Sequence, residues 1–245
     1  MANTHFSGPV LFSAARPTLE NLNIGSWPDQ TRFMADFTGI VLDATNDWTV
    51  VKDSGASVAL QADALNGVVD LTSAATTDND GSSIQGNEIW GLPSTAGQKL
   101  YFESRFQMSD ADQMDLYIGL SENFATSPEN VLTAANRIGF RIVDGDATPV
   151  LITESGGSET STTLSVTTYD FSDATDVTVS FIATKGTTTD KVKFFIDRTL
   201  VGTHSTNVPT VNLTAAAMEL SGNATGTKSM SIDYIMVAQD RGVSY

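Results

Sequence analysis

Short segments in which apolar and polar residues alternate are the feature that most constrains the fold of this chain. In residues 99–108, Leu100, Phe102, Phe106 and Met108 occupy positions that share one side of an extended strand. Successive side chains of a strand point to opposite faces of a sheet, so this segment is predicted to be a strand with one buried face. Clusters of Gly, Thr and Ser follow at short intervals, which is typical of many short strands joined by turns.

Five more segments repeat this alternation. They are residues 114–120, 138–142, 177–181, 192–196 and 230–236. In the last of these, Met230, Ile232, Tyr234 and Met236 are expected to share one face.

Only residues 128–135 look helical, because Ser127 could serve as an N-cap and Pro128 occupies the first helical position. Strands do not alternate with long amphipathic helices, which argues against a parallel α/β sheet. We therefore predict an all-β fold, an antiparallel β-sandwich with at most one short helix.

Residues 1–38 differ in character from the rest of the chain. They contain Pro17 and Pro28 and show no steady alternation. We interpret them as an extended N-terminal arm, followed by one sandwich domain at residues 39–245, since a single all-β domain often fills such a length. The alternative is that the apolar residues of this segment form an edge strand or line the base of the sandwich. Those residues are Phe6, Val10, Leu11 and Phe12.

Charge and cysteine content exclude several classes of function. The 245 residues include 13 Lys and Arg against 29 Asp and Glu, a formal net charge of −16. This balance argues against nucleic acid and anionic membranes as partners, because both require clustered basic residues. No apolar run approaches the roughly 18–20 residues that span a bilayer. The absence of cysteine excludes disulfide scaffolds and thiolate zinc sites.

Two segments near the C-terminus resemble a known family. Residues 231–237, with the sequence Ser-Ile-Asp-Tyr-Ile-Met-Val, are similar to the closing strand of concanavalin A-like lectin/glucanase jelly rolls, which include the laminin G-like domains. Residues 193–201 resemble the preceding hairpin of that family, although Arg198 stands where glycine is common in the turn. The resemblance implies a concanavalin A-like jelly roll.

Four other segments narrow the resemblance. Residues 77–85, 100–108 and 115–120 are similar, as a series, to jelly-roll proteins of tailed-phage virions, and residues 1–10 resemble the beginnings of phage structural proteins. The resemblance implies a non-enzymatic virion structural protein, most directly a head decoration or cement protein on the capsid surface. A lectin-like glycan-binding module of a fibre or appendage is the alternative, and a glycan hydrolase is a minor one.

A decoration protein implies two partners. One is the major capsid protein of the same particle, and the other is a further copy of this chain. A homo-oligomer is expected because capsid sites come in symmetric sets, and a trimer is favoured. The arm would clamp neighbouring capsid subunits through apolar anchors. The predicted capsid-binding residues are Phe6, Val10, Leu11, Phe12 and Trp27.

The residues expected of an enzyme were not found in the sequence. Jelly-roll glucanases use carboxylates in the pattern Glu-x-Asp-x-x-Glu on one strand, and no glutamate here is followed two positions later by aspartate. There is no Gly-x-Ser-x-Gly motif, and the two histidines, His5 and His204, lie far apart in the sequence. We therefore predict no catalytic residue and no enzymatic activity.

One oxygen-rich turn is a candidate cation site. Asp78, Asn79 and Asp80 are consecutive, and calcium binds carboxylate and carbonyl oxygens from such loops. The alternative is that these residues only form a turn, for which Asp and Asn are common. No other cofactor is predicted. Trp48 is expected to anchor the core, and for Trp90 a core position and a sugar-binding position both stay open.

Overall fold

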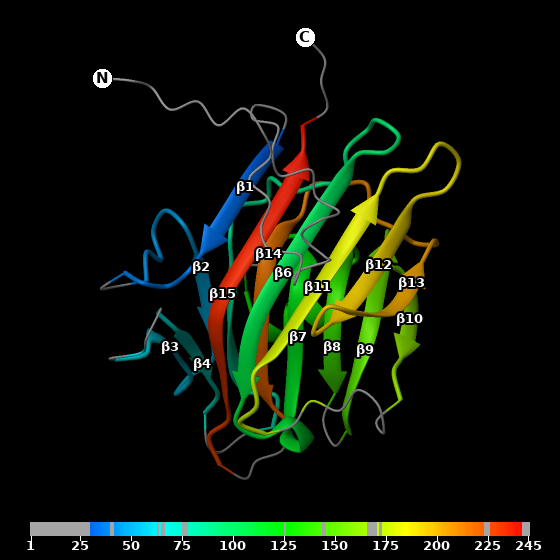
Figure 1. The fold of residues 1–245 in the computed structure, drawn as a ribbon. Coiled ribbons are helices and arrows are strands. Elements are labelled where there is room, and N and C mark those ends of the chain that lie inside the picture. Colours follow the sequence, from blue (N-terminus) through cyan, green and yellow to red (C-terminus); the bar gives the residue numbers. More distant parts are fainter. Residues whose placement is uncertain are drawn as a thin grey trace, which may run out of the picture.

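The protein is a sandwich of two antiparallel sheets (Figure 1). The computed structural model describes residues 30–39, 42–62, 64, 67–74, 78–124, 126–143, 146–165, 171, 173–222 and 226–241. Among these residues, no helix is both long and apolar enough to cross a membrane.

Sheet A contains eight strands. In spatial order seven of them are β13 (Thr199–His204), β12 (Lys191–Ile196), β11 (Val177–Thr184), β6 (Lys99–Met108), β15 (Ser229–Asp240), β4 (Val69–Thr72) and β3 (Ser57–Leu60). The eighth, β1 (Gln30–Ala35), pairs with β15 beyond the part that pairs with β4.

Sheet B contains seven strands and lies behind sheet A in Figure 1. Its order is β10 (Ser158–Thr163), β9 (Asp146–Ser155), β8 (Arg137–Val143), β7 (Met114–Ser121), β14 (Thr214–Ser221), β5 (Gly81–Gln85) and β2 (Thr49–Lys52). The 3-10 helices η1 (Ala111–Gln113) and η2 (Pro128–Thr133) are short connections. These observations confirm the predicted all-β jelly-roll sandwich.

Alternating side chains of both sheets meet in one aromatic-rich core. Phe102 of β6 and Phe181 of β11 stack with ring centroids 5.3 Å apart. Phe194 of β12 meets Phe140 of β8 edge to face at 5.5 Å, which joins the two sheets directly. Such contacts add to the stabilisation that comes from removing apolar surface from water. Trp48 is buried against Phe33 and Phe37, in the core as predicted.

The final strand differs from its predicted pattern. Between Ile232 and Tyr234 the register of β15 against β6 shifts by one residue. An extra residue in one strand reverses which face the following side chains occupy. Ile235 therefore enters the core with Ile232, whereas Tyr234 and Met236 point to the outer face of sheet A.

The short connections also differ in detail from the predictions. The segment expected to be helical forms the 3-10 helix η2, and Ser127 makes no side-chain capping hydrogen bond. The turn from β12 to β13 places Asp197 and Arg198 at φ values of 46° and 68°. Both lie in the left-handed region, as a two-residue type I′ hairpin turn requires, so the turn forms without glycine.

The predicted arm, residues 1–38, contains one strand of the sandwich. Gln30 to Ala35 form β1, which is hydrogen-bonded to the end of β15. The predicted capsid-binding residues lie outside the described residues. They are Phe6, Val10, Leu11, Phe12 and Trp27.

Candidate functional site

The outer face of sheet B carries a row of charged residues across three neighbouring strands. The β9–β10 hairpin turns at Gly156 and Gly157, whose φ values are 58° and 79°. This two-residue turn sets the register, so Glu154 lies directly opposite Glu159. On the other side of β9, Glu154 lies opposite Arg137 of β8.

One arginine contacts both glutamates. Arg137 Nε lies 2.7 Å from Glu154 Oε2, and Arg137 Nη2 lies 2.7 Å from Glu159 Oε2. The first contact does not have the alignment of a hydrogen bond, so the attraction there is mainly ionic. Arg141 Nη1 is 3.3 Å from the same Glu159 oxygen. The side chains of Arg137 and Glu154 are 4% and 10% exposed, whereas Arg141 and Glu159 are 21% and 26% exposed.

The buried end of this charged row also contacts the connection that packs on the outer face of sheet B. Arg137 Nη1 donates a hydrogen bond to Val131 O at 2.9 Å, which ties the guanidinium to η2. Tyr117 Oη lies 2.7 Å from Leu120 O and 3.2 Å from Ile138 O. Burial raises the pKa of Tyr117 above its usual range, so this hydroxyl remains a hydrogen-bond donor at all physiological pH values. The charged row is therefore preorganised.

The other half of the outer face is covered by apolar residues. Phe124 and Val131 pack on Met218 of β14 and Tyr117 of β7. The backbone N–H of Phe124 donates to Gln85 Oε1 at 3.0 Å, and Gln85 Nε2 donates back to Phe124 O. The connection between β7 and β8 thus lies over β14 and β5. Among the described residues of this face, the accessible polar side chains are those of Arg141 on β8 and of the residues on β10.

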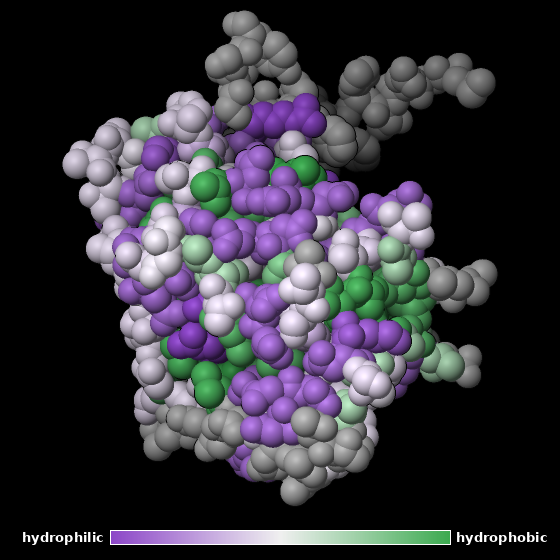
Figure 2. Space-filling model, turned by 180° about the vertical axis from the view of Figure 1, so that it is seen from behind, coloured by the Kyte–Doolittle hydropathy of each residue, from purple (hydrophilic) through white to green (hydrophobic). Residues whose placement is uncertain are grey.

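This accessible part is suited to polar ligands with many hydroxyl groups. A guanidinium presents five N–H donors and a carboxylate presents two acceptor oxygens. Arg141 and Glu159 offer both kinds of group next to the exposed hydroxyl of Ser161. Figure 2 shows this side of the molecule, where hydrophilic residues predominate.

The predicted calcium residues form a turn. Asn79 has a left-handed φ of 64°. Its N–H donates to Ser221 O at 2.8 Å, and Ser221 N–H donates to Asp80 O at 3.0 Å. No group of three or more His, Asp or Glu side chains that could hold a metal ion occurs in the described part of the chain. Calcium binding at Asp78, Asn79 and Asp80 stays a prediction.

Two other residues considered in the sequence lie inside the molecule. Trp90 is 3% exposed and belongs to the core. His204 of β13 is also buried, with Thr153 Oγ1 3.0 Å from Nδ1 and Thr162 Oγ1 3.0 Å from Nε2. Burial lowers its pKa. These hydroxyl contacts give His204 the role of joining the edges of the two sheets.

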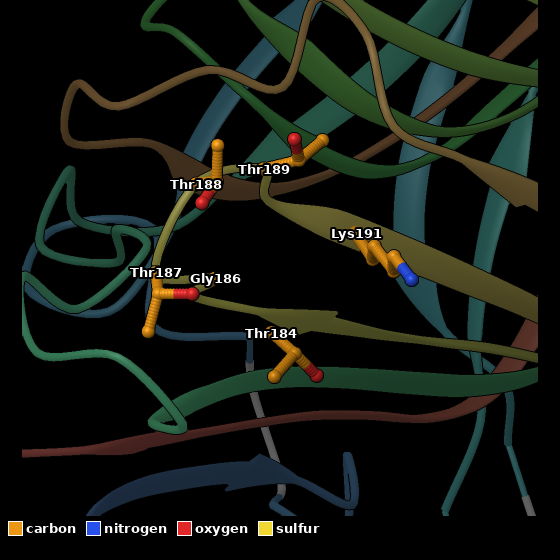
Figure 3. A pocket seen from close by; sticks show the side chains of 6 residues that line it. All are labelled: Thr184, Gly186, Thr187, Thr188, Thr189 and Lys191. Atoms are coloured by element: carbon orange, nitrogen blue, oxygen red, sulfur yellow. The ribbon is translucent and has the colours of Figure 1, made fainter.

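A shallow hollow of about 440 Å³ lies at the β11–β12 turn (Figure 3). It is lined by Thr184, Gly186, Thr187, Thr188, Thr189 and Lys191. The loop is held by Asp190, which accepts hydrogen bonds from Lys185 Nζ and from the Gly186 N–H, both at 3.0 Å. This hollow contains hydroxyl groups and one cation but no aromatic platform and no carboxylate.

Comparisons with solved structures identify the fold. An endo-1,3-β-glucanase from Streptomyces sioyaensis is similar with a TM-score of 0.63 and 14% identity, covering 87% of this chain and 98% of that one. The CBM2 module of the evolved Dit of Lactobacillus casei BL23 phage J-1 has a TM-score of 0.56 and 12% identity, covering 89% and 98%. Peanut lectin has a TM-score of 0.52 and 12% identity, covering 88% and 100%. No protein-family model and no curated protein matches the chain.

The chain therefore has a concanavalin A-like jelly-roll fold, shared with glucanases and lectins. These comparisons contradict the prediction that the protein is not an enzyme, because several of the similar structures are endo-glucanases. That prediction had considered carboxylates along one strand only. The structure instead brings Glu154 and Glu159 together across two strands.

The sequence analysis missed all four charged residues of the site. The segment Glu-Ser-Gly-Gly-Ser-Glu at residues 154–159 is a palindrome around a Gly-Gly turn, and this alone pairs Glu154 with Glu159. Arg137 and Arg141 occupy alternate polar positions of one predicted strand in a chain with few basic residues. These two signals could have located the site, but not its ion pairs.

Proposed function

We propose that this protein is a carbohydrate-binding component of a phage particle, with its glycan site at the accessible end of the charged row on sheet B. The observation that carries the proposal is the preorganised set of Arg137, Glu154, Glu159 and Arg141. Further support comes from the similarity to a CBM2 module of a phage Dit and to a lectin, and from the sequence resemblance to tailed-phage virion proteins.

The chemistry of the site favours a neutral glycan. Every cation of the row already has a carboxylate partner, and the chain as a whole is strongly acidic. An acidic polysaccharide would therefore meet net repulsion. A neutral sugar would exchange hydrogen bonds with Arg141 and Glu159 without adding charge. Because the similar glucanases act on β-linked glucans by their printed names, we propose this substrate class as the first to test.

Binding to insoluble and oligomeric β-glucans tests the proposal. The Arg141→Ala and Glu159→Gln variants are expected to weaken binding at least tenfold, since each removes a polar contact from an accessible position. Lys193→Ala is the matched control, because Lys193 is an exposed cation on β12 of the other sheet. Equal loss in all three variants, or no binding by the unaltered protein, would contradict the proposal.

We also propose that the particle site is the head, with the major capsid protein as partner and a homo-oligomer, favoured as a trimer, as the bound form. The anchors would be the five apolar residues of the N-terminal segment named above. Co-sedimentation with expanded heads that lack this protein tests the idea. Saturable binding that is lost on deletion of residues 1–23 supports it, and unchanged binding by the deletion variant contradicts it.

A second candidate function is glycoside hydrolysis, favoured by the Glu154 and Glu159 pair. Glycosidases use two carboxyl groups on either side of the scissile bond, one of which must be protonated. Both glutamates contact Arg137, which holds the two carboxyl groups close together. A reducing-sugar assay on β-glucans with the Glu154→Gln and Glu159→Gln variants tests this function. Product formation that both variants abolish supports it.

A further inference from the structure

The edge strand β10 presents its two faces to different parts of the molecule. Glu159 and Ser161 lie on the outer face of sheet B, where Glu159 contacts Arg137. Thr160 and Thr162 alternate with them, and their hydroxyls contact the end of β13 and the residues that follow it. β10 and β13 are the outermost strands of their sheets at the right of Figure 1. The inner face of β10 therefore helps to fix the outer face, which carries the proposed glycan site.

His204 is the central residue of these contacts. Its Nε2 lies 3.0 Å from Thr162 Oγ1 of β10, and its Nδ1 is bonded to a hydroxyl of β9. Thr160 is held by the two residues beyond this point, because its Oγ1 lies 2.8 Å from Thr206 Oγ1 and accepts a hydrogen bond from Asn207 Nδ2 at 3.0 Å. Within sheet B, β10 pairs with β9 on one side only. These side-chain contacts therefore supplement a single ladder.

The hydroxyl contacts determine which nitrogen of the His204 ring carries a hydrogen. Thr153 Oγ1 has one hydrogen and donates it to Thr206 O at 3.1 Å, because a carbonyl oxygen can only accept. The same hydroxyl must then accept from His204 Nδ1, which lies 3.0 Å away. In a neutral ring Nε2 therefore has a free lone pair and accepts from the Thr162 hydroxyl. We assign His204 as the neutral Nδ1–H form.

Protonation disturbs this arrangement. It places a hydrogen on Nε2, opposite the hydrogen of Thr162, so that hydroxyl must turn away. It also puts a charge on a ring that packs against Phe194, with ring centroids 5.1 Å apart. Burial lowers the pKa of His204. The stabilisation by the neutral ring is therefore complete above the unfolded-state pKa of about 6.5 and is lost as the pH falls through the lowered folded-state pKa.

No titratable side chain among the described residues of the adjoining elements faces the ring. Strand alternation places their charged residues on the outer faces of the two sheets or at the far ends of the strands. Residues 199–213 contain no Asp, Glu, Lys or Arg. The charged residues of these elements are Glu154 and Glu159 on the outer face of sheet B, Lys191 and Lys193 on the outer face of sheet A, Asp146 at the far end of β9, and Asp197 and Arg198 in the turn before β13.

We propose that His204 is a positioning residue for the glycan site, whose neutral ring keeps β10 in place and whose protonation releases that strand. The inference rests on the proposed carbohydrate-binding function and adds its regulation by acid. Glu159 and Ser161 belong to the strand that is released, so the site loses part of its preorganisation when the ring is charged. Glycan binding is therefore strongest in neutral solution and weakens as His204 takes up a proton.

The pH dependence of binding to a β-1,3-glucan oligosaccharide tests the inference. Affinity is compared one pH unit above and one unit below the titration midpoint of the His204 ring, measured by NMR. The unaltered protein should lose about fivefold in affinity, as it would if about a fifth of the molecules kept β10 in place. His204→Gln should lose much less, because its amide donates and accepts but does not titrate. The same loss in His204→Gln as in the unaltered protein would overturn the inference.

His5→Gln is the matched control, since His5 is the other histidine of the chain. It should keep the pH profile of the unaltered protein, and it also assigns the two ring signals. A profile that flattens in His5→Gln and not in His204→Gln would overturn the role of His204. Carboxyl groups that titrate in the same range are shared by all three proteins, so they do not affect the comparison.

NMR spectra of the ¹⁵N-labelled protein without glycan provide an independent readout. The His204 ring should carry its hydrogen on Nδ1 at pH 7.5, and the β10 backbone amide shifts should follow the ring titration in the unaltered protein only. A hydrogen on Nε2, or β10 shifts that ignore the titration, would overturn the inference. Absence of glucan binding alongside the expected spectra would instead contradict the proposed function and support the hold of His204 on β10.

Discussion

Arg137 Nε lies 2.7 Å from Glu154 Oε2 in a nearly buried ion pair, directly across the β8–β9 ladder. Removing one partner of a buried ion pair leaves an uncompensated charge, which typically costs about 3–5 kcal/mol. We therefore expect Arg137→Met to lower the free energy of unfolding in urea by about that amount. Arg141→Met, at the more exposed end, should cost about 1 kcal/mol or less. Equal effects would contradict the account of the site.

A double variant refines this prediction. Arg137→Met alone leaves the Glu154 carboxylate buried without its cation. The double variant Arg137→Met, Glu154→Leu removes that carboxylate as well. The double variant should therefore be more stable than Arg137→Met alone, because well-packed apolar residues often replace a buried ion pair at little cost. Urea unfolding of the single and double variants measures the difference. A double variant less stable than Arg137→Met would show that the charge itself is not the source of the loss.

Glu219 makes the stability depend on pH. Its side chain lies in the sandwich interior without a well-aligned hydrogen bond among the described residues. Burial raises its pKa from 4.5 to about 9, and Ser73 lowers it slightly. Above pH 4.5 the unfolded chain loses this proton while the folded protein keeps it. The contribution of Glu219 to stability is therefore fully present below pH 4.5 and is lost as the pH rises toward 9.

The Glu219→Gln variant should abolish this dependence. Relative to the unaltered protein, its free energy of unfolding is expected to rise by about 1 kcal/mol per pH unit between pH 5 and 8. Guanidinium unfolding at several pH values measures the difference, and the comparison cancels the titration of His204. A difference that is constant with pH would contradict the raised pKa.

The outer face of sheet A contains a hydrogen-bonded carboxylate. Tyr234 Oη donates to Glu103 Oε1 at 2.7 Å, and Tyr101 Oη donates to Glu103 Oε2. Hydrogen bonds to charged groups contribute about 1.5–3 kcal/mol. Tyr234→Phe should therefore destabilise the protein by that amount, as measured by urea unfolding. A change below about 0.5 kcal/mol would show that water replaces the hydroxyl.

Gly186 is required by close backbone approach. A Cβ atom at this position would lie 1.9 Å from Thr189 O. Gly186→Ala must therefore reshape the β11–β12 turn and should lower the melting temperature by several degrees, since about 1 kcal/mol corresponds to about 2–4 °C for a domain of this size. Gly86→Ala is the control, because its Cβ would make only ordinary contacts, the nearest at 3.7 Å. Equal shifts would contradict the steric argument.

The alternation of apolar and polar residues predicted the strands well, because each alternating segment has one face in the sandwich core and the other face outside it. Residues 99–108 and 114–120 form strands with the inward residues expected. The pattern failed at Asp233, because a one-residue bulge leaves no mark in composition but reverses the face of Tyr234 and Met236. The charged row was not predicted because Arg137 meets Glu159 only through the order of β8, β9 and β10 in space.

The most direct test of the central claim is an NMR titration of the ¹⁵N-labelled protein with a β-1,3-glucan oligosaccharide. The account predicts saturable chemical-shift changes centred on Arg141, Glu159 and Ser161, which vanish in the Glu159→Gln variant. Changes confined to other parts of the molecule, or none at millimolar sugar, would contradict a carbohydrate site on the outer face of sheet B.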